Sequence, residues 1–130
     1  MIVDASALLA IVQGEPDGQA IAALLSNSTE ERRISPVNVW EVSTKLNRAG
    51  APDAVRATRD LLLSFAIVSE DVDTKQMHAA MSAQTRYGKK NHPANLNLAD
   101  CFAYALAVTR GEPLLYKGDD FSKTDVRQAR

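Results

Sequence analysis

The chain has 130 residues, of which 45% are hydrophobic, and its formal net charge at pH 7 is −1. This length suits one domain spanning residues 1–130, the hydrophobic content excludes a disordered chain, and the charge gives no global basic field of the kind that nucleic-acid binders often carry. No long apolar run and no signal-peptide pattern is visible, so we expect no membrane span. The single cysteine, Cys101, excludes an internal disulfide, and together these features predict a cytoplasmic protein.

The first half of the chain alternates short apolar strands with helices. Ile2-Val3 predicts a buried strand, followed by a helix that begins at Asp4 or Ser6 and runs through Val12. Pro36 suits the first turn of a helix. The other elements expected here are a helix from about Asp17 to Ser26, a strand at residues 33–35, a helix from Pro36 to near Gly50, and a helix from Pro52 to about Ser64 with Val55, Leu62 and Phe65 facing the core.

The second half continues the alternation. A helix apolar on nearly every side, Leu98 to Thr109, is expected to be buried. The remaining predicted elements are a strand at residues 66–68, a helix from Glu70 to Tyr87 ended by Gly88, a polar loop from Lys89 to Asn97, a strand at residues 114–116, and a short tail from Phe121 to Arg130. Strands alternating with helices predict an α/β fold with a parallel sheet covered on both faces.

Four acids occupy positions where an apolar pattern would otherwise continue or has just ended: Asp4, Glu41, Asp100 and Asp119. Asp4 and Asp119 each follow a predicted strand. Because sites in open parallel sheets form beyond the carboxyl ends of the strands, we expect these two acids at the same edge of the sheet.

Each acid also has a structural explanation. Asp4 suits a helix N-cap, Glu41 could face solvent, and Asp100 lies close enough to the start of its helix to cap it. Asp119 and its neighbour Asp120 could be ordinary turn residues. The functional interpretation depends on the acids acting together.

A cluster of carboxylates needs a cation to offset its repulsion. Two carboxylates about 4 Å apart repel by about 4 kcal/mol at an effective dielectric of 20. Oxygen ligands favour Mg²⁺ or Mn²⁺ over Zn²⁺, and neither His78 nor His92 has a partner at zinc-like spacing. Cys101 is interpreted as a small core residue. A carboxylate-held Mg²⁺ suits hydrolysis of a phosphodiester, and the absence of a glycine-rich phosphate loop argues against a nucleotide triphosphatase.

Four sequence blocks resemble the PIN-domain family, and within it the VapC-type toxins of bacterial toxin–antitoxin pairs. The blocks are Ile2-Val3-Asp4-Ala5-Ser6-Ala7-Leu8, residues 35–42 around Glu41, residues 96–103 around Asp100, and residues 116–125 around Asp119. Each block is weakly specific alone, but their order and spacing over nearly the whole chain are strongly specific. The resemblance implies a PIN-like three-layer fold, a short parallel sheet flanked by helices.

The resemblance also implies a function and a set of residue roles. We expect a Mg²⁺- or Mn²⁺-dependent endoribonuclease, a cognate antitoxin partner and a homodimer. Asp4 and Asp100 match the direct metal ligands, and Glu41 and Asp119 complete the acidic pocket, with Asp119 preferred over Asp120 as the fourth acid. Ser6 and Thr124 match positions that support the acids by hydrogen bonds.

The segment before the Asp100 helix is locally cationic. No Asp or Glu lies between Asp73 and Asp100, and Arg86, Lys89 and Lys90 are expected to contact RNA phosphates, although a solvated surface is the alternative.

Two competing functions stay open. One is a PIN-like module that binds RNA or protein without catalysis, and the other is an aspartyl-phosphate phosphotransfer domain, which would want an acid where Ser6 stands.

Overall fold

The fold is built on a small parallel sheet. A computed structural model describes all residues from 1 to 130. The strands β1 (Ile2–Val3), β2 (Arg32–Ile34), β3 (Ile67–Ser69) and β4 (Leu114–Leu115) are all parallel and lie in the order β3-β2-β1-β4. The helices are α1 (Ala5–Val12), α2 (Gly18–Asn27), α3 (Pro36–Arg48), α4 (Ala54–Ser64), α5 (Thr74–Tyr87) and α6 (Leu98–Arg110), followed by a short 3-10 helix, Phe121–Lys123.

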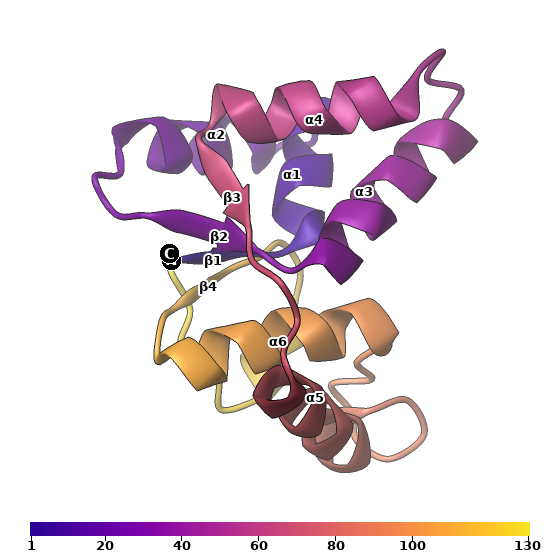
Figure 1. Cartoon of the computed structure of the whole chain (residues 1–130), viewed down its shortest axis with the longest axis vertical. Coiled ribbons are helices and arrows are strands. Elements are labelled where there is room, and N and C mark those ends of the chain that lie inside the picture. Colours follow the sequence, from indigo (N-terminus) through magenta and orange to yellow (C-terminus); the bar gives the residue numbers. More distant parts are fainter.

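The sheet separates two hydrophobic cores and so forms the middle of three layers. Figure 1 shows α1 to α4 on one side of the strands and α5 and α6 on the other. Neighbouring residues of a strand pack into opposite cores. Val3 and Leu115 belong to the core on the α1–α4 side, and Ile2 and Leu114 belong to the core on the α5–α6 side. This alternation follows from the two-residue period of a strand. It confirms the predicted α/β architecture.

Three details differ from the sequence-based prediction. The helix predicted from Glu70 begins at Thr74, because Asp73 caps it by accepting a hydrogen bond from the Gln76 amide at 2.8 Å. Val55 is 63% exposed rather than inward, since α4 packs through Ala54 and Thr58 instead. The C-terminal tail is not a free end, because the Leu114 amide donates to the Arg127 carbonyl at 2.8 Å along the outer edge of β4.

The carboxyl ends of β1 and β4 are locked together. The Asp4 amide donates to the Leu115 carbonyl at 2.9 Å, so the residues that follow both strands emerge side by side. The start of α3 and the start of α6 lie at the same edge, where the Asn38 side chain of α3 reaches the Ala99 carbonyl of α6. This edge positions the candidate site. None of the helices is long and apolar enough to cross a membrane.

Candidate active site

Asp4 lies at the centre of the acidic site and is almost completely buried, with 2% of its surface exposed. It caps α1, because its Oδ2 accepts from the Ser6 amide at 2.9 Å and from the Ser6 hydroxyl at 2.6 Å. Burial raises the pKa of Asp4 to about 6, against the lowering effect of the Ser6 hydrogen bonds and with a smaller raising effect from the charge of Glu41. The capping and functional interpretations of Asp4 are therefore compatible.

Asn38 is a site residue that the sequence analysis missed. It is fully buried in the first turn of α3, and its amide nitrogen donates to Asp4 Oδ1 at 3.0 Å and to the Ala99 carbonyl at 3.2 Å. Its own Oδ1 is buried without a hydrogen-bond partner. Asn38 thus ties the Asp4 carboxylate to the start of the helix that carries Asp100. The available signal was an amide in an apolar run, one helical turn before Glu41.

Asp100 lies in the first turn of α6 and forms a reciprocal capping box with Asn97. Its Oδ2 accepts from the Asn97 amide at 2.9 Å while its own amide donates to Asn97 Oδ1 at 2.9 Å. Its second oxygen, Oδ1, makes no hydrogen bond within the protein and is open to another ligand. Burial, followed by the charge of Asp4, raises the pKa of Asp100 to about 7. The contribution from the charge of Asp4 indicates that the two carboxylates belong to one acidic site.

Glu41 belongs to the same cluster but is turned toward a lysine. It lies on α3, its side chain is 13% exposed, and its Oε1 is 3.3 Å from Lys45 Nζ. Its charge nevertheless contributes to the raised pKa values of both Asp4 and Asp100. The charge of Glu41 therefore acts on Asp4 and Asp100, while its carboxylate is held by an ion pair with Lys45.

The loop after β4 approaches the site through Ser6. The Lys117 amide donates to Ser6 Oγ at 3.0 Å, so Ser6 links the Asp4 carboxylate to the loop that carries the adjacent acids. Both Asp119 and Asp120 are exposed. The charge of Asp120 raises the pKa of Asp100, whereas the charge of Asp119 acts on Tyr116. The charge of Asp120 therefore acts on the cluster, and the preference for Asp119 as the fourth acid, based on the sequence, stays a prediction.

Of the two predicted supporting residues, only Ser6 contacts an acid. Thr124 donates from its hydroxyl to the Phe121 carbonyl at 2.7 Å and accepts from the Val126 amide at 3.2 Å. It closes the turn after the 3-10 helix and bonds to no carboxylate. The expectation that Thr124 supports an acid directly is therefore not met in this structure.

The cluster suits Mg²⁺ or Mn²⁺ with few protein ligands. No group of three or more His, Cys, Asp or Glu side chains converges closely enough to hold an ion, which differs from the four-ligand pocket expected from the sequence. Mg²⁺, however, commonly binds through one or two carboxylates and keeps several waters. Asp4 and Asp100 offer such a pair of oxygen ligands, and the unpartnered Asn38 Oδ1 leaves a further polar atom at this place. The donor set fits a hard divalent cation.

The predicted RNA-binding cations differ in their surroundings. The Arg86 guanidinium pairs with Asp125 at 3.2 Å and lies over the Tyr87 ring at 4.8 Å, so part of its charge is already offset. Lys89 and Lys90 are exposed on the loop between α5 and α6 and form no ion pair. The two lysines are therefore the more available cations of this segment.

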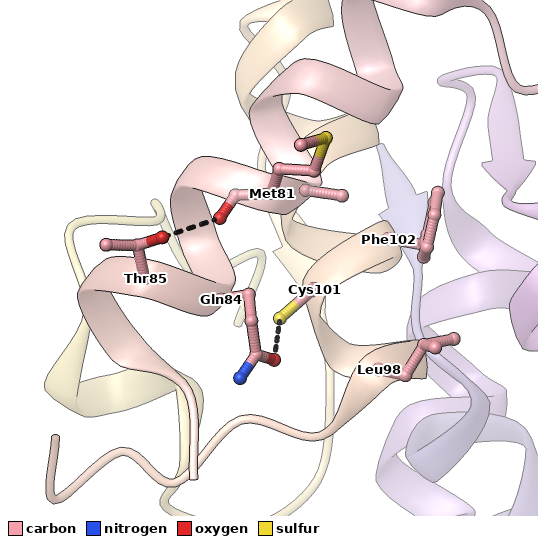
Figure 2. A pocket seen from close by; sticks show the side chains of 7 residues that line it. Met81, Gln84, Thr85, Leu98, Cys101 and Phe102 are labelled. Atoms are coloured by element: carbon pink, nitrogen blue, oxygen red, sulfur yellow. Dashed lines mark hydrogen bonds between the residues drawn. The ribbon is translucent and has the colours of Figure 1, made fainter. Parts of the chain in front are cut away.

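Cys101 lies in the contact between α5 and α6. Figure 2 shows its sulfur directed at the Gln84 side chain, with Sγ 3.7 Å from Oε1. Cys101 is 3% exposed, and burial raises the pKa of its thiol to about 11. Such a thiol stays protonated at neutral pH, as the core interpretation predicts. The adjoining pocket, about 490 Å³ and mostly apolar, carries no charged side chain and is separate from the acidic site.

Comparisons with known proteins agree with this geometry. Residues 1–127 match the model of the family described as PIN domain. The chain is 43% identical over 130 residues to "Ribonuclease VapC42" of Mycobacterium tuberculosis, an alignment that covers 99% of this chain and 98% of that protein.

Two solved structures share the fold. The M. tuberculosis VapC20 toxin, described as cleaving the sarcin-ricin loop, superposes with a TM-score of 0.79 at 20% identity, covering 99% of this chain and 98% of that one. A toxin–antitoxin complex from Klebsiella pneumoniae gives a TM-score of 0.70 at 17% identity, covering 95% and 92%. These identities support the fold alone, while the family match extends over nearly the whole sequence. The chain belongs to the PIN domain family.

Proposed function

We propose that this protein is a metal-dependent endoribonuclease and the toxin of a toxin–antitoxin pair. The observation that carries the proposal is the pair of the buried Asp4 and the half-buried Asp100, held at one sheet edge with raised pKa values in a chain that matches a named ribonuclease from end to end. A pure binding module gains nothing from two acids that repel each other, whereas a cation-dependent nuclease needs them.

Each residue at the edge has a distinct role in this proposal. Asp4 and Asp100 would hold Mg²⁺ or Mn²⁺, which would supply Lewis-acid stabilisation of the phosphate and a more acidic water. Ser6 and Asn38 fix the Asp4 carboxylate through the hydrogen bonds described above. Glu41 would add negative charge to the site and, on leaving Lys45, would accept a proton from the attacking water.

The cation requirement gives the direct test of this function. Purified protein should cleave total RNA in Mg²⁺ or Mn²⁺ and lose that activity in EDTA, because the ligands are all oxygen. Ca²⁺ should support little turnover, since its looser coordination positions water poorly. Mapping the new 5′ ends measures cleavage and identifies the sites. Undiminished cleavage in EDTA would contradict a metal-assisted mechanism, and RNA binding without cleavage in any cation would favour the binding-only alternative.

The adjacent acids of the closing loop provide a matched pair. Asp120→Asn should lower the rate of RNA cleavage more than Asp119→Asn, because the charge of Asp120 is among the main causes that raise the pKa of Asp100, whereas the charge of Asp119 raises the pKa of Tyr116. Loss of one charge beside the cation should cost about 10-fold or more. Cleavage rates of the two variants at saturating Mg²⁺ measure the difference. A larger loss in Asp119→Asn would restore Asp119 as the fourth acid of the pocket.

We also propose that Lys89 and Lys90 contact RNA phosphates. They lie in the loop before α6. The Lys89 amide donates to the Leu96 carbonyl, and Leu96 directly precedes Asn97, the N-cap of α6. The double variant Lys89→Gln/Lys90→Gln should bind RNA more weakly and reduce the slope of log K against log salt by about 1.4, or 0.7 for each lost single-strand contact. Lys75→Gln, at the opposite end of α5, is the control. An unchanged salt dependence of RNA binding in the double variant would show that the two lysines do not contact RNA and belong to a solvated surface.

The partners follow from the same function. We propose a cognate antitoxin, in line with the structural neighbour described as a toxin–antitoxin complex, and a homodimer, as the family resemblance implies. An acidic site also attracts a basic antitoxin side chain, which would compete with the cation. We place the protein in the cytoplasm, where its RNA substrate and a co-expressed antitoxin are found.

A further inference from the structure

A second feature opens directly onto the acidic site. A cleft of about 310 Å³ runs between α3 and the start of α6. Its α3 wall carries Glu41, and its α6 wall begins at Asn97, the residue that caps Asp100. This volume lies at the lower end of the range for small-ligand sites, about 300 to 1,000 Å³, and suits a single nucleotide. Trp40, Thr44, Lys45 and Arg48 complete the α3 wall.

The wall contributed by α3 combines an aromatic ring with a cation. Trp40, Thr44 and Arg48 are spaced four residues apart and therefore lie on one face of the helix. Trp40, the only tryptophan of the chain, is 67% exposed, although a side chain of this size is normally well buried. Arg48 is exposed in the last turn of α3 and forms no ion pair. The Glu41–Lys45 pair lies beside this row.

We infer that this cleft binds a nucleotide of single-stranded RNA, with its base stacked on Trp40 and a neighbouring phosphate on Arg48. The inference rests on the proposed ribonuclease function and names a contact of its substrate. Stacking on an exposed ring suits unpaired bases, because the bases of a duplex are already stacked inside the helix. The RNA strand would then run from the cleavage site at Asp4, past Glu41 and Trp40, to Arg48.

Binding is measured in an Asp100→Asn background, so that RNA is not consumed. A short fluorescein-labelled single-stranded RNA should bind about 10-fold more weakly when Trp40→Ala is added, the loss expected for one base–aromatic stack. Trp40→Phe should retain most of the affinity. Leu63→Ala, a 72% exposed side chain on α4, is the matched control and should change nothing. A hairpin duplex of the same composition should be insensitive to Trp40→Ala.

Two further readouts separate stacking from loss of fold. The emission of Trp40 should be quenched on addition of RNA, and it reports this position alone because the chain has no other tryptophan. In a series of RNAs, each with one abasic nucleotide at a different position, binding to the parent protein should weaken at one position. With that RNA, adding Trp40→Ala should cause no further loss of affinity. Arg48→Gln should reduce the salt slope by about 0.7, while Trp40→Ala leaves that slope unchanged.

The outcomes distinguish this cleft from the function on which it rests. Equal RNA affinity in the parent and Trp40→Ala, or an abasic series with no coupled position, overturns the stacking site. A change in oligomeric mass of Trp40→Ala with unchanged RNA affinity also overturns it and assigns Trp40 to an interface between copies. If wild-type protein cleaves no RNA in Mg²⁺ but the quenching and abasic coupling are found, the ribonuclease proposal fails while the single-strand binding cleft stands.

Discussion

Asp100→Asn should abolish RNA cleavage and at the same time stabilise the metal-free protein. Losing one of two carboxylate ligands removes cation stabilisation worth several kcal/mol, so the cleavage rate should fall by at least roughly 1,000-fold. The substituted amide can still accept the Asn97 amide hydrogen bond through its oxygen, which keeps the start of α6 capped. Loss of activity therefore does not require loss of fold.

The stabilisation follows from the sign of the pKa shifts. Unfolded aspartate titrates near pH 3.9, whereas Asp4 and Asp100 have pKa values of about 6 and 7 in the folded protein. Between about pH 4 and pH 7 the folded state binds more protons than the unfolded state, so stability falls as pH rises through this window. Removing the Asp100 charge should raise the free energy of unfolding at pH 8 by about 1 to 4 kcal/mol and flatten its pH dependence.

Urea denaturation in EDTA at several pH values measures this effect beside the cleavage assay. Asp60→Asn is the matched control, because Asp60 is 65% exposed on α4 and its nearest cation, Arg56, is 4.0 Å away. It should change neither cleavage nor stability noticeably. Wild-type cleavage by purified Asp100→Asn protein would contradict the proposed metal site. A large loss of stability at pH 8 would instead show that the Asp100 charge is needed for folding.

Expression of the wild-type chain without its antitoxin should arrest bacterial growth, whereas Asp4→Asn should not. An unregulated endoribonuclease destroys RNA that the cell needs, and Asp4 is the buried acid around which the site is assembled. Growth after induction, compared at equal amounts of soluble protein, measures the effect. The neighbouring small open reading frame, when co-expressed, should restore growth and yield a co-purifying complex. Equal growth of the wild type and Asp4→Asn would argue against a toxin while leaving a nuclease possible.

Several parts of the fold were predictable because they depend on local pattern. Asp4 caps α1 through a hydrogen bond to the residue two positions later, and Pro36 opens α3, both of which are short-range effects. The α5 start and the orientation of Val55 were not predicted correctly. The Asp73 cap of α5 is a local feature that the sequence analysis did not use, whereas the exposure of Val55 depends on which face of α4 packs against the core.

The sequence by itself determined which residues could form a site: acids at element ends, in an order and spacing typical of one family. Parallel strands bring their carboxyl ends to one edge, so the meeting of the β1 and β4 ends was implied by topology. Only the tertiary structure decided the contacts within that edge. Asn38 bridges Asp4 to α6, Ser6 accepts a hydrogen bond from the Lys117 amide of the loop after β4, and the charge of Asp120 acts on Asp100. These contacts join residues far apart in sequence, and their geometry is set by how helices pack across the sheet, which no local pattern records.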